Sequence, residues 1–205
     1  MNNSVSTQTP RKDRGRPREF DTDRALERAM QLFRQKGFHA ASITDLSAAM
    51  MLTSGSIYKA FTDKRTLFLR AFERYTSCRN TELRRRLESL ADGRERLMAL
   101  LRFYIDSAHD VEGRRGCLVV GSVVALTGLD KELAELVEQA VMRNKRLIVT
   151  LVEEGQQDGS FSQRLNAEAA AQLILCLVFG MRVVGKIENI IDPEDTLRLA
   201  MKLLD

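Results

Sequence analysis

Apolar residues recur every three or four positions through most of the chain, which is the spacing that places them on one face of an α-helix. In the first such segment, from Arg24 onward, they are Ala25, Leu26, Ala29, Met30, Leu32 and Phe33. Asp21 is a candidate N-cap for this helix, and Gly37 has the backbone freedom that ends one. Trp is absent and aromatic residues make up only 6%, which is low for an all-β protein. The pattern predicts an all-α fold.

Two very short helices follow the first. Ser42 is a candidate N-cap for a helix over 43–50, and Asp45 at the third helical position completes a capping box. The next helix begins at Thr53 or Ser54. Helices of about eight residues are not stable alone in water, so we expect both to pack on a neighbour and to keep one face free.

The rest of the chain carries longer apolar segments. The predicted helices cover 64–90, 94–111, 117–126, 130–154, 167–187 and 194–204. Their start signals are Asp63, Asp130, Asn166 and Asp192 with Pro193, and their stop signals include Gly128 and Gly155. The segment 167–187 is apolar around most of its circumference, which predicts burial by the core on one side and by a second copy of the chain on the other.

Positive charge is concentrated at the N-terminal end, which also holds the short helices. Residues 1–75 carry 14 Lys and Arg against 8 Asp and Glu, whereas residues 76–205 carry 18 against 20. A basic region beside a near-neutral one predicts a module that binds a polyanion, joined to a region with another task.

Residues 1–20 are polar and basic, and we predict that they form a flexible arm. The basic part, RKDRGRPR, is broken by Gly and Pro and so cannot form a stable helix. Arg14, Arg16 and Arg18 suit the insertion of an extended arm into a narrow minor groove of DNA. The alternative is a solvated tail that attracts phosphates without specificity.

The segment 53–64 has the chemistry of a helix that reads DNA. It opens with the small residues Thr53, Ser54, Gly55 and Ser56. Small residues let a helix N-terminus approach DNA, where hydroxyl and backbone N–H groups meet phosphate oxygens or base edges. Tyr58 and Lys59 offer a phenol and a cation for phosphate, thymine methyl or guanine, whereas Ile57 and Phe61 are predicted to pack inward. Further contacts to backbone phosphates are predicted from Thr44 and Lys64.

The sequence TSGSIYKAFTDKRTLF, within the segment 24–72, resembles the DNA-binding domain of the TetR family of bacterial transcriptional regulators. That family shows small residues with Gly, then Tyr, Phe, Lys and Leu at this spacing. The resemblance implies a three-helix DNA-binding domain over 21–68, with a helix-turn-helix in its second and third helices, followed by a larger helical ligand-binding and dimerisation domain over 69–205. It also implies a homodimer that binds a palindromic operator on double-stranded DNA, represses transcription, and releases the operator when an inducer binds.

Cys117 and Lys186 are candidate sensing residues of the C-terminal region. Cys117 follows two arginines at the start of a predicted helix, and both features stabilise a thiolate. Gly-Cys-Leu with a Lys on the penultimate helix resembles a TetR subgroup that senses electrophiles and hypochlorite-type oxidants, in which the Cys and the Lys become covalently linked. The alternative is an ordinary small-molecule inducer in an apolar pocket, with Cys117 as a buried filling residue.

Arg182 is a cation in the middle of an apolar segment. The favoured interpretation is a pair with an acid such as Glu138 or Glu153, and the alternative is contact with an anionic ligand.

The same sequence argues against several other classes of protein. No uninterrupted apolar run approaches the ~18 residues of a membrane span, and the N-terminus lacks the apolar core of a secretory signal. Cys78, Cys117 and Cys176 are widely separated and lack metal-ligand spacing, which fits a reducing cytoplasm. No nucleophile–base pair or phosphate loop is visible, so we expect neither an enzyme nor a cofactor. A nonspecific architectural DNA-binding protein remains an alternative, but it leaves the apolar helical region without a role.

Overall fold

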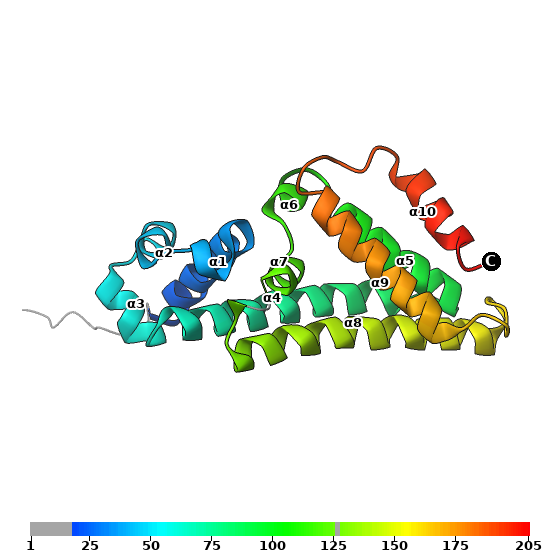
Figure 1. Cartoon of the computed structure of the whole chain (residues 1–205), viewed down its shortest axis with the longest axis horizontal. Helices are drawn as coiled ribbons and strands as arrows, with labels where there is room; N and C mark the ends of the chain where they lie inside the picture. The colour runs from blue at the N-terminus through cyan, green and yellow to red at the C-terminus, as the bar shows by residue number, and fades with distance from the viewer. Residues whose placement is uncertain (1–17, 126–127) are drawn as a thin grey trace, which may run out of the picture.

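The computed structural model describes residues 18–125 and 128–205, and the regular secondary structure of this part of the chain is helical. The helices are α1 (Arg18–Ala40), α2 (Ile43–Met50), α3 (Ser54–Phe61), α4 (Lys64–Leu87), α5 (Gly93–Asp106), α6 (Asp110–Arg115), α7 (Leu118–Val124), α8 (Lys131–Asp158), α9 (Ala167–Val184) and α10 (Pro193–Lys202). Figure 1 shows an elongated molecule with α2 and α3 at one end, α10 toward the other, and α4 and α8 along the long axis. The predicted all-α fold is confirmed.

The short helices α2 and α3 begin at the side-chain caps predicted from the sequence. Ser42 Oγ accepts the backbone N–H of Asp45 at 3.0 Å, and Asp45 Oδ2 accepts the N–H of Ser42 at 3.0 Å, which closes the capping box. Lys36 donates to Asp45 at 2.7 Å, and this bond together with those from Ser42 lowers the pKa of Asp45 to about 2. Thr53 caps α3 by accepting the N–H of Ser56 at 3.2 Å.

Helix α1 begins earlier than predicted. It starts at Arg18, so the interpretation of Asp21 as its N-cap is wrong, because an N-cap has non-helical backbone. Residues 18–21 contain neither Gly nor Pro, so their backbone does not oppose the helix. Gly37, with φ of 77°, interrupts the helix as expected.

Gly155 does not end α8, contrary to the prediction. The helix continues to Asp158 and stops at Gly159, where φ is 83°. A Cβ on Gly155 would lie 2.3 Å from Cδ2 of Phe161, and a Cβ on Gly93 would lie 2.2 Å from the nitrogen of Gly155. Gly155 therefore serves the close packing of α5 and the 159–165 loop on α8, which local sequence does not reveal.

Other boundaries also differ from the predictions where the chain turns to pack. The segment 94–111 is divided into α5 and α6, and α4, α7 and α9 each end before the predicted residue. Gly185, just after α9, shows one cause: a Cβ there would lie 2.4 Å from the carbonyl oxygen of Ala108. The chain leaves α9 at this close contact with the turn before α6.

Two apolar clusters hold the helices together. One joins α1, α2 and α3 to the first half of α4, to α7 and to the first half of α8, with Phe33, Phe61, Phe68 and Phe72 fully buried. The other joins the end of α4 to α5, α9, α10 and the second half of α8. Because α4 and α8 contribute to both clusters, the N-terminal helices rest on the same long helices as the C-terminal ones.

Helix α9 is the most apolar element. Its 18 residues have a mean hydropathy of 1.7, so by length and composition alone it is long and apolar enough to cross a membrane, although no uninterrupted apolar run reaches that length. A core helix of a globular protein also meets this criterion. Here α9 packs against α5 and α8 and buries Arg182 near its end.

Candidate functional site

Helix α3 has one buried face and one free face. Ile57 and Phe61 are 0% and 1% exposed, so the prediction that they pack inward is confirmed. Tyr58 is 49% exposed, and Lys59 is also exposed. The residues of the helix entry are exposed too: Thr53, Ser54, Gly55 and Ser56. The predicted DNA-contact residues of α3 therefore share one surface.

The hydroxyl groups at the entry of α3 also organise the turn between α2 and α3. Thr53 Oγ1 lies 3.0 Å from Ser56 Oγ, and Ser54 Oγ lies 3.1 Å from Ser47 Oγ on α2. A Cβ placed on Gly55 would meet only Thr53 Oγ1, at 3.9 Å. The fold itself therefore accepts a side chain at Gly55, and any requirement for glycine there arises outside this chain.

Lys64 and Thr44 occupy different positions around this surface. Thr44 is exposed in the first turn of α2. Lys64 is partly buried, because its Nζ donates to the carbonyl of Ala41 at 3.1 Å and lies 4.7 Å above the ring of Phe38. Lys64 thus braces α4 against the end of α1, and an ammonium group keeps further N–H donors for a phosphate.

The predicted arginine arm lies mostly beyond the described residues. Arg14 and Arg16 fall outside them. Arg18 is the first residue of α1, so the expectation that it belongs to an extended arm is wrong, because the segment without Gly and Pro begins at this residue.

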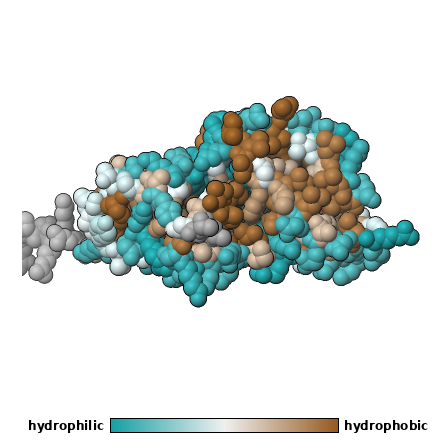
Figure 2. Space-filling model, viewed as in Figure 1, coloured by the Kyte–Doolittle hydropathy of each residue, from teal (hydrophilic) through white to brown (hydrophobic). Residues whose placement is uncertain are grey.

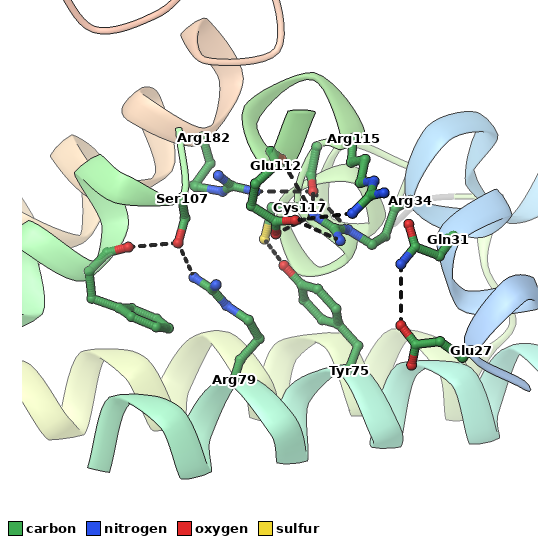
Figure 3. A network of polar contacts seen from close by, with 12 residues as sticks. Glu27, Gln31, Arg34, Tyr75, Arg79, Ser107, Glu112, Arg115, Cys117 and Arg182 are labelled. Carbon is green, nitrogen blue, oxygen red and sulfur yellow. Dashed lines mark hydrogen bonds and ion pairs between the residues drawn. The ribbon is translucent and has the colours of Figure 1, made fainter. Parts of the chain in front are cut away.

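Cys117 lies between two hollows at the start of α7. Its Sγ accepts a hydrogen bond from the hydroxyl of Tyr75 at 3.4 Å (Figure 3). One hollow, of about 150 Å³, is lined by both Cys117 and Lys186, and the other, of about 30 Å³, is lined by Cys117, Arg79 and Tyr104. The structure therefore brings the two predicted sensing residues to one cavity.

Arg182 pairs with neither acid proposed for it. Glu138 and Glu153 are exposed on α8, whereas Arg182 is 2% exposed and points to the junction of α6 and α7. Its Nη2 donates to the carbonyl of Gly116 at 3.1 Å. Its Nε and Nη1 have no hydrogen-bond partner among the described residues. The favoured interpretation from the sequence is wrong, because the inward side of α9 faces a backbone carbonyl.

Arg34 on α1 is a functional candidate that sequence reasoning missed. Its side chain is 4% exposed, and its Nε and Nη2 donate to the same Gly116 carbonyl at 3.0 and 2.7 Å. Its Nη1 and Nη2 also donate to the carboxylate of Glu112 at 3.3 and 2.5 Å (Figure 3). One feature of the sequence could have indicated that Arg34 is buried: it follows Met30 by four residues, on the apolar face of α1.

Tyrosines and a further arginine complete this cluster. Burial raises the pKa of Tyr104 to about 12; Cys117 also raises it, while the charges of Arg79 and Arg182 oppose the rise. Burial likewise raises the pKa of Tyr75. Arg79 donates to Ser107, a neutral partner, at 2.6 Å. Arg34, Arg79 and Arg182 thus lie near Cys117, and of these three Arg34 is the one that is paired with an acid among the described residues.

Comparison with known proteins gives two matching family models. They are "Bacterial regulatory proteins, tetR family" over residues 25–71 and "Tetracyclin repressor-like, C-terminal domain" over 93–201. The HTH-type transcriptional repressor ComR of Escherichia coli (strain K12) is 25% identical over 184 residues, which cover 88% of this chain and 87% of ComR.

A solved structure shows the same relationship in three dimensions. A cysteine mutant of the TetR family transcriptional regulator CifR, complexed with 26 bp double-strand operator DNA, aligns with a TM-score of 0.80 and 30% sequence identity. The alignment covers 93% of this chain and 100% of that one. The C-terminal family model alone spans more than half of the chain, and the helix-turn-helix model spans most of α1 through the start of α4. The chain therefore belongs to the TetR family of DNA-binding transcriptional regulators.

Proposed function

We propose that this regulator is a repressor that binds a palindromic operator as a homodimer, with α3 in the major groove, and releases it when an inducer binds. The free face of α3 is the observation that carries the proposal. It presents a phenol, a cation and a helix N-terminus together, while the opposite face is buried. The operator complex of CifR supports the same use of this domain.

A strip of exposed apolar side chains supports the dimer. Figure 2 shows them gathered over α9 and the chain that follows it. They include Leu173, Val183, Val184, Ile187, Ile191, Leu199 and Leu203. Ile187 and Ile191 are 85% and 96% exposed, which is costly for a chain that stays alone in water. A two-fold dimer through this strip would match the symmetry of a palindromic site.

Replacing either Tyr58 or Lys59 by Ala tests the proposed reading helix. Each change removes one contact from each half-site, and at about 1–3 kcal/mol per contact the dimer loses about 2–6 kcal/mol, which weakens operator binding by about thirtyfold or more in a fluorescence anisotropy titration. Arg164→Ala is the matched control, because Arg164 is an exposed cation in the loop after α8, far from α3 (Figure 1).

Circular dichroism and sedimentation should show unchanged helicity and dimerisation in both α3 variants. Operator affinity that stays at the wild-type value in both variants would contradict the role of α3. Footprinting of the wild type decides between regulator and architectural protein: a regulator protects a short palindrome at physiological salt, whereas an architectural protein covers DNA without preference.

The cluster around Cys117 is the proposed origin of inducer control. Arg34 belongs to α1, which packs on α2 and α4, and its guanidinium holds the Gly116 carbonyl just before Cys117. A ligand in the two hollows that moves the Gly116 carbonyl therefore acts on Arg34 and, through α1, on the DNA-binding helices. Release of the operator requires that the ligand favour the arrangement in which the two α3 helices no longer match the half-sites.

Oxidation is a second candidate signal, favoured by the shared cavity of Cys117 and Lys186. A Cβ on Gly116 would lie 3.5 Å from Cδ and Cε of Lys186, so the lysine stem passes beside the residue before the thiol. Hypochlorous acid would oxidise the thiol by two electrons, and the lysine amine would bond to sulfur. The products are a sulfur–nitrogen link, chloride, water and one proton.

A further inference from the structure

We propose that Arg182, together with Arg79 and Tyr104, forms a binding site for a small organic carboxylate. Binding of this carboxylate does not depend on the proposed function, whereas its role as the inducer rests on that function. The site lies between α4, α5 and α9, next to Cys117.

The bonding of Arg182 is incomplete. The side chain is 2% exposed, and its one hydrogen bond among the described residues goes to the Gly116 carbonyl. The N–H groups of Nε and Nη1 are buried without an acceptor there. Buried guanidinium groups are normally paired, and carboxylate and phosphate oxygens are their usual partners. This arginine therefore has donors for an acceptor that the described fold does not supply.

The charge around Arg182 is also uncompensated within the described chain. Glu112, the acid of the cluster, accepts from Arg34 and lies 4.0 Å from Arg115. Arg79 points into the same region and donates to the hydroxyl of Ser107. Figure 3 shows Arg182 and Arg79 approaching from opposite helices, on the same side of Cys117. A carboxylate would balance this positive charge.

The lining of the adjacent hollow indicates the rest of the ligand. Tyr104 and Phe179 supply aromatic surface, and Val119 and Ala140 supply aliphatic surface. The charges of both Arg79 and Arg182 act on Tyr104, which places the two arginines near this aromatic wall. The small hollow, of about 30 Å³, and the larger one, of about 150 Å³, both border Cys117. The arginine donors suit the carboxylate of a small organic acid, and the apolar lining suits its remaining part. Because the small hollow has room for only one or two water molecules, such a ligand must widen it on binding.

The bond between Arg182 and Gly116 gives the site a connection to DNA binding. Arg182 and Arg34 donate to the same carbonyl oxygen. A carboxylate bound at Nε and Nη1 of Arg182 shifts the guanidinium whose Nη2 holds this carbonyl, and so changes the support of the contact that Arg34 makes from α1. The carbonyl oxygen of Gly116 therefore connects the proposed carboxylate site to α1.

Isothermal titration calorimetry on the DNA-free protein tests the site, with acetate, benzoate and octanoate as probes and the matching amides as neutral controls. We expect at least one acid to bind about tenfold or more tightly than its amide, because only the acid carries the negative charge that forms an ion pair with Arg182. Arg182→Met should weaken that acid by about tenfold or more and leave its amide unchanged. Arg146→Met, at an exposed arginine of α8, is the matched control and should change neither.

Three results would overturn the proposal: no acid of the series binds, acid and amide bind equally, or Arg182→Met binds the acid as the wild type does. If Arg182→Met does not fold by circular dichroism, Arg182→Lys replaces it and must also weaken the acid relative to the amide. Operator affinity is measured separately by anisotropy. Acid binding without operator binding refutes the proposed function alone, whereas operator binding without acid binding refutes this site alone.

Discussion

Two buried arginines donate to one carbonyl oxygen, and replacing each by Met is expected to have a different effect on stability. Arg34→Met removes the bonds to Gly116 and the pair with Glu112. Arg182→Met removes one bond to Gly116 and, with it, the buried N–H groups that have no acceptor among the described residues. Met fills a similar volume in both places, so the difference reports the polar interactions.

The magnitudes follow from what each change leaves behind. After Arg34→Met, Gly116 keeps the donor of Arg182, and Glu112, whose side chain is 35% exposed, reaches water. The loss is then that of a charge-assisted pair with a partly exposed acid, about 2–3 kcal/mol. After Arg182→Met, Gly116 keeps both donors of Arg34, and removing unpaired buried donors offsets the lost bond, so the change stays within about 1 kcal/mol.

Urea unfolding followed by circular dichroism at one fixed protein concentration measures both variants, because unfolding of a dimer depends on concentration. An unchanged m-value would show that the folded and unfolded states keep their compactness. Equal losses in the two variants, or a larger loss for Arg182→Met, would refute the reasoning, since Arg182 would then have a stabilising partner. An Arg34→Met variant as stable as the wild type would show that the bridge from α1 contributes nothing.

Two further predictions concern the C-terminal region. Gly155→Ala is expected to destabilise the fold by about 1–3 kcal/mol, because the added Cβ would lie 2.3 Å from the Phe161 ring; Gly121→Ala, with nothing within 4 Å of the added Cβ, is the control and should not destabilise it. In the oxidation candidate, hypochlorite should release the operator and remove two hydrogen atoms from the mass of the wild type but not of Cys117→Ser. Release that is unchanged in Cys117→Ser would end that candidate.

Much of the N-terminal region was predictable because its signals act over a few residues. Ser42 with Asp45, Thr53 and Asp63 cap their helices through bonds to backbone groups three residues away, and such bonds depend little on the rest of the fold. Ile57 and Phe61 face inward because helical spacing separates them from Tyr58 and Lys59. The DNA-contact residues themselves remain predictions, since their partner is another molecule.

The helix boundaries expected at Gly155 and at Asp21 were wrong for different reasons. Glycine often ends a helix, but α8 continues through Gly155 because Phe161 and the start of α5 need the space that its missing side chain leaves. Aspartate often caps a helix, but α1 begins before Asp21, at Arg18, because no residue of 18–21 disfavours a helix. The residue type limits the backbone conformations at a position, and at Gly155 the packing of distant segments decides which of them occurs.

The sequence by itself determined the all-helical class, the caps of the short helices and the family to which the chain belongs, because periodicity, capping and a motif are properties of neighbouring residues. Only the tertiary structure decided the environment of Cys117. Gly116 meets Arg34 across 82 residues of chain and Arg182 across 66, and no pattern along the sequence encodes that meeting. Arg182 was visible as a charge in an apolar segment, but its burial and its bond to Gly116 rather than to Glu138 or Glu153 follow from how α9 packs beside α6 and α7. Long-range packing thus decided that this charge is buried beside the Gly116 carbonyl and Cys117.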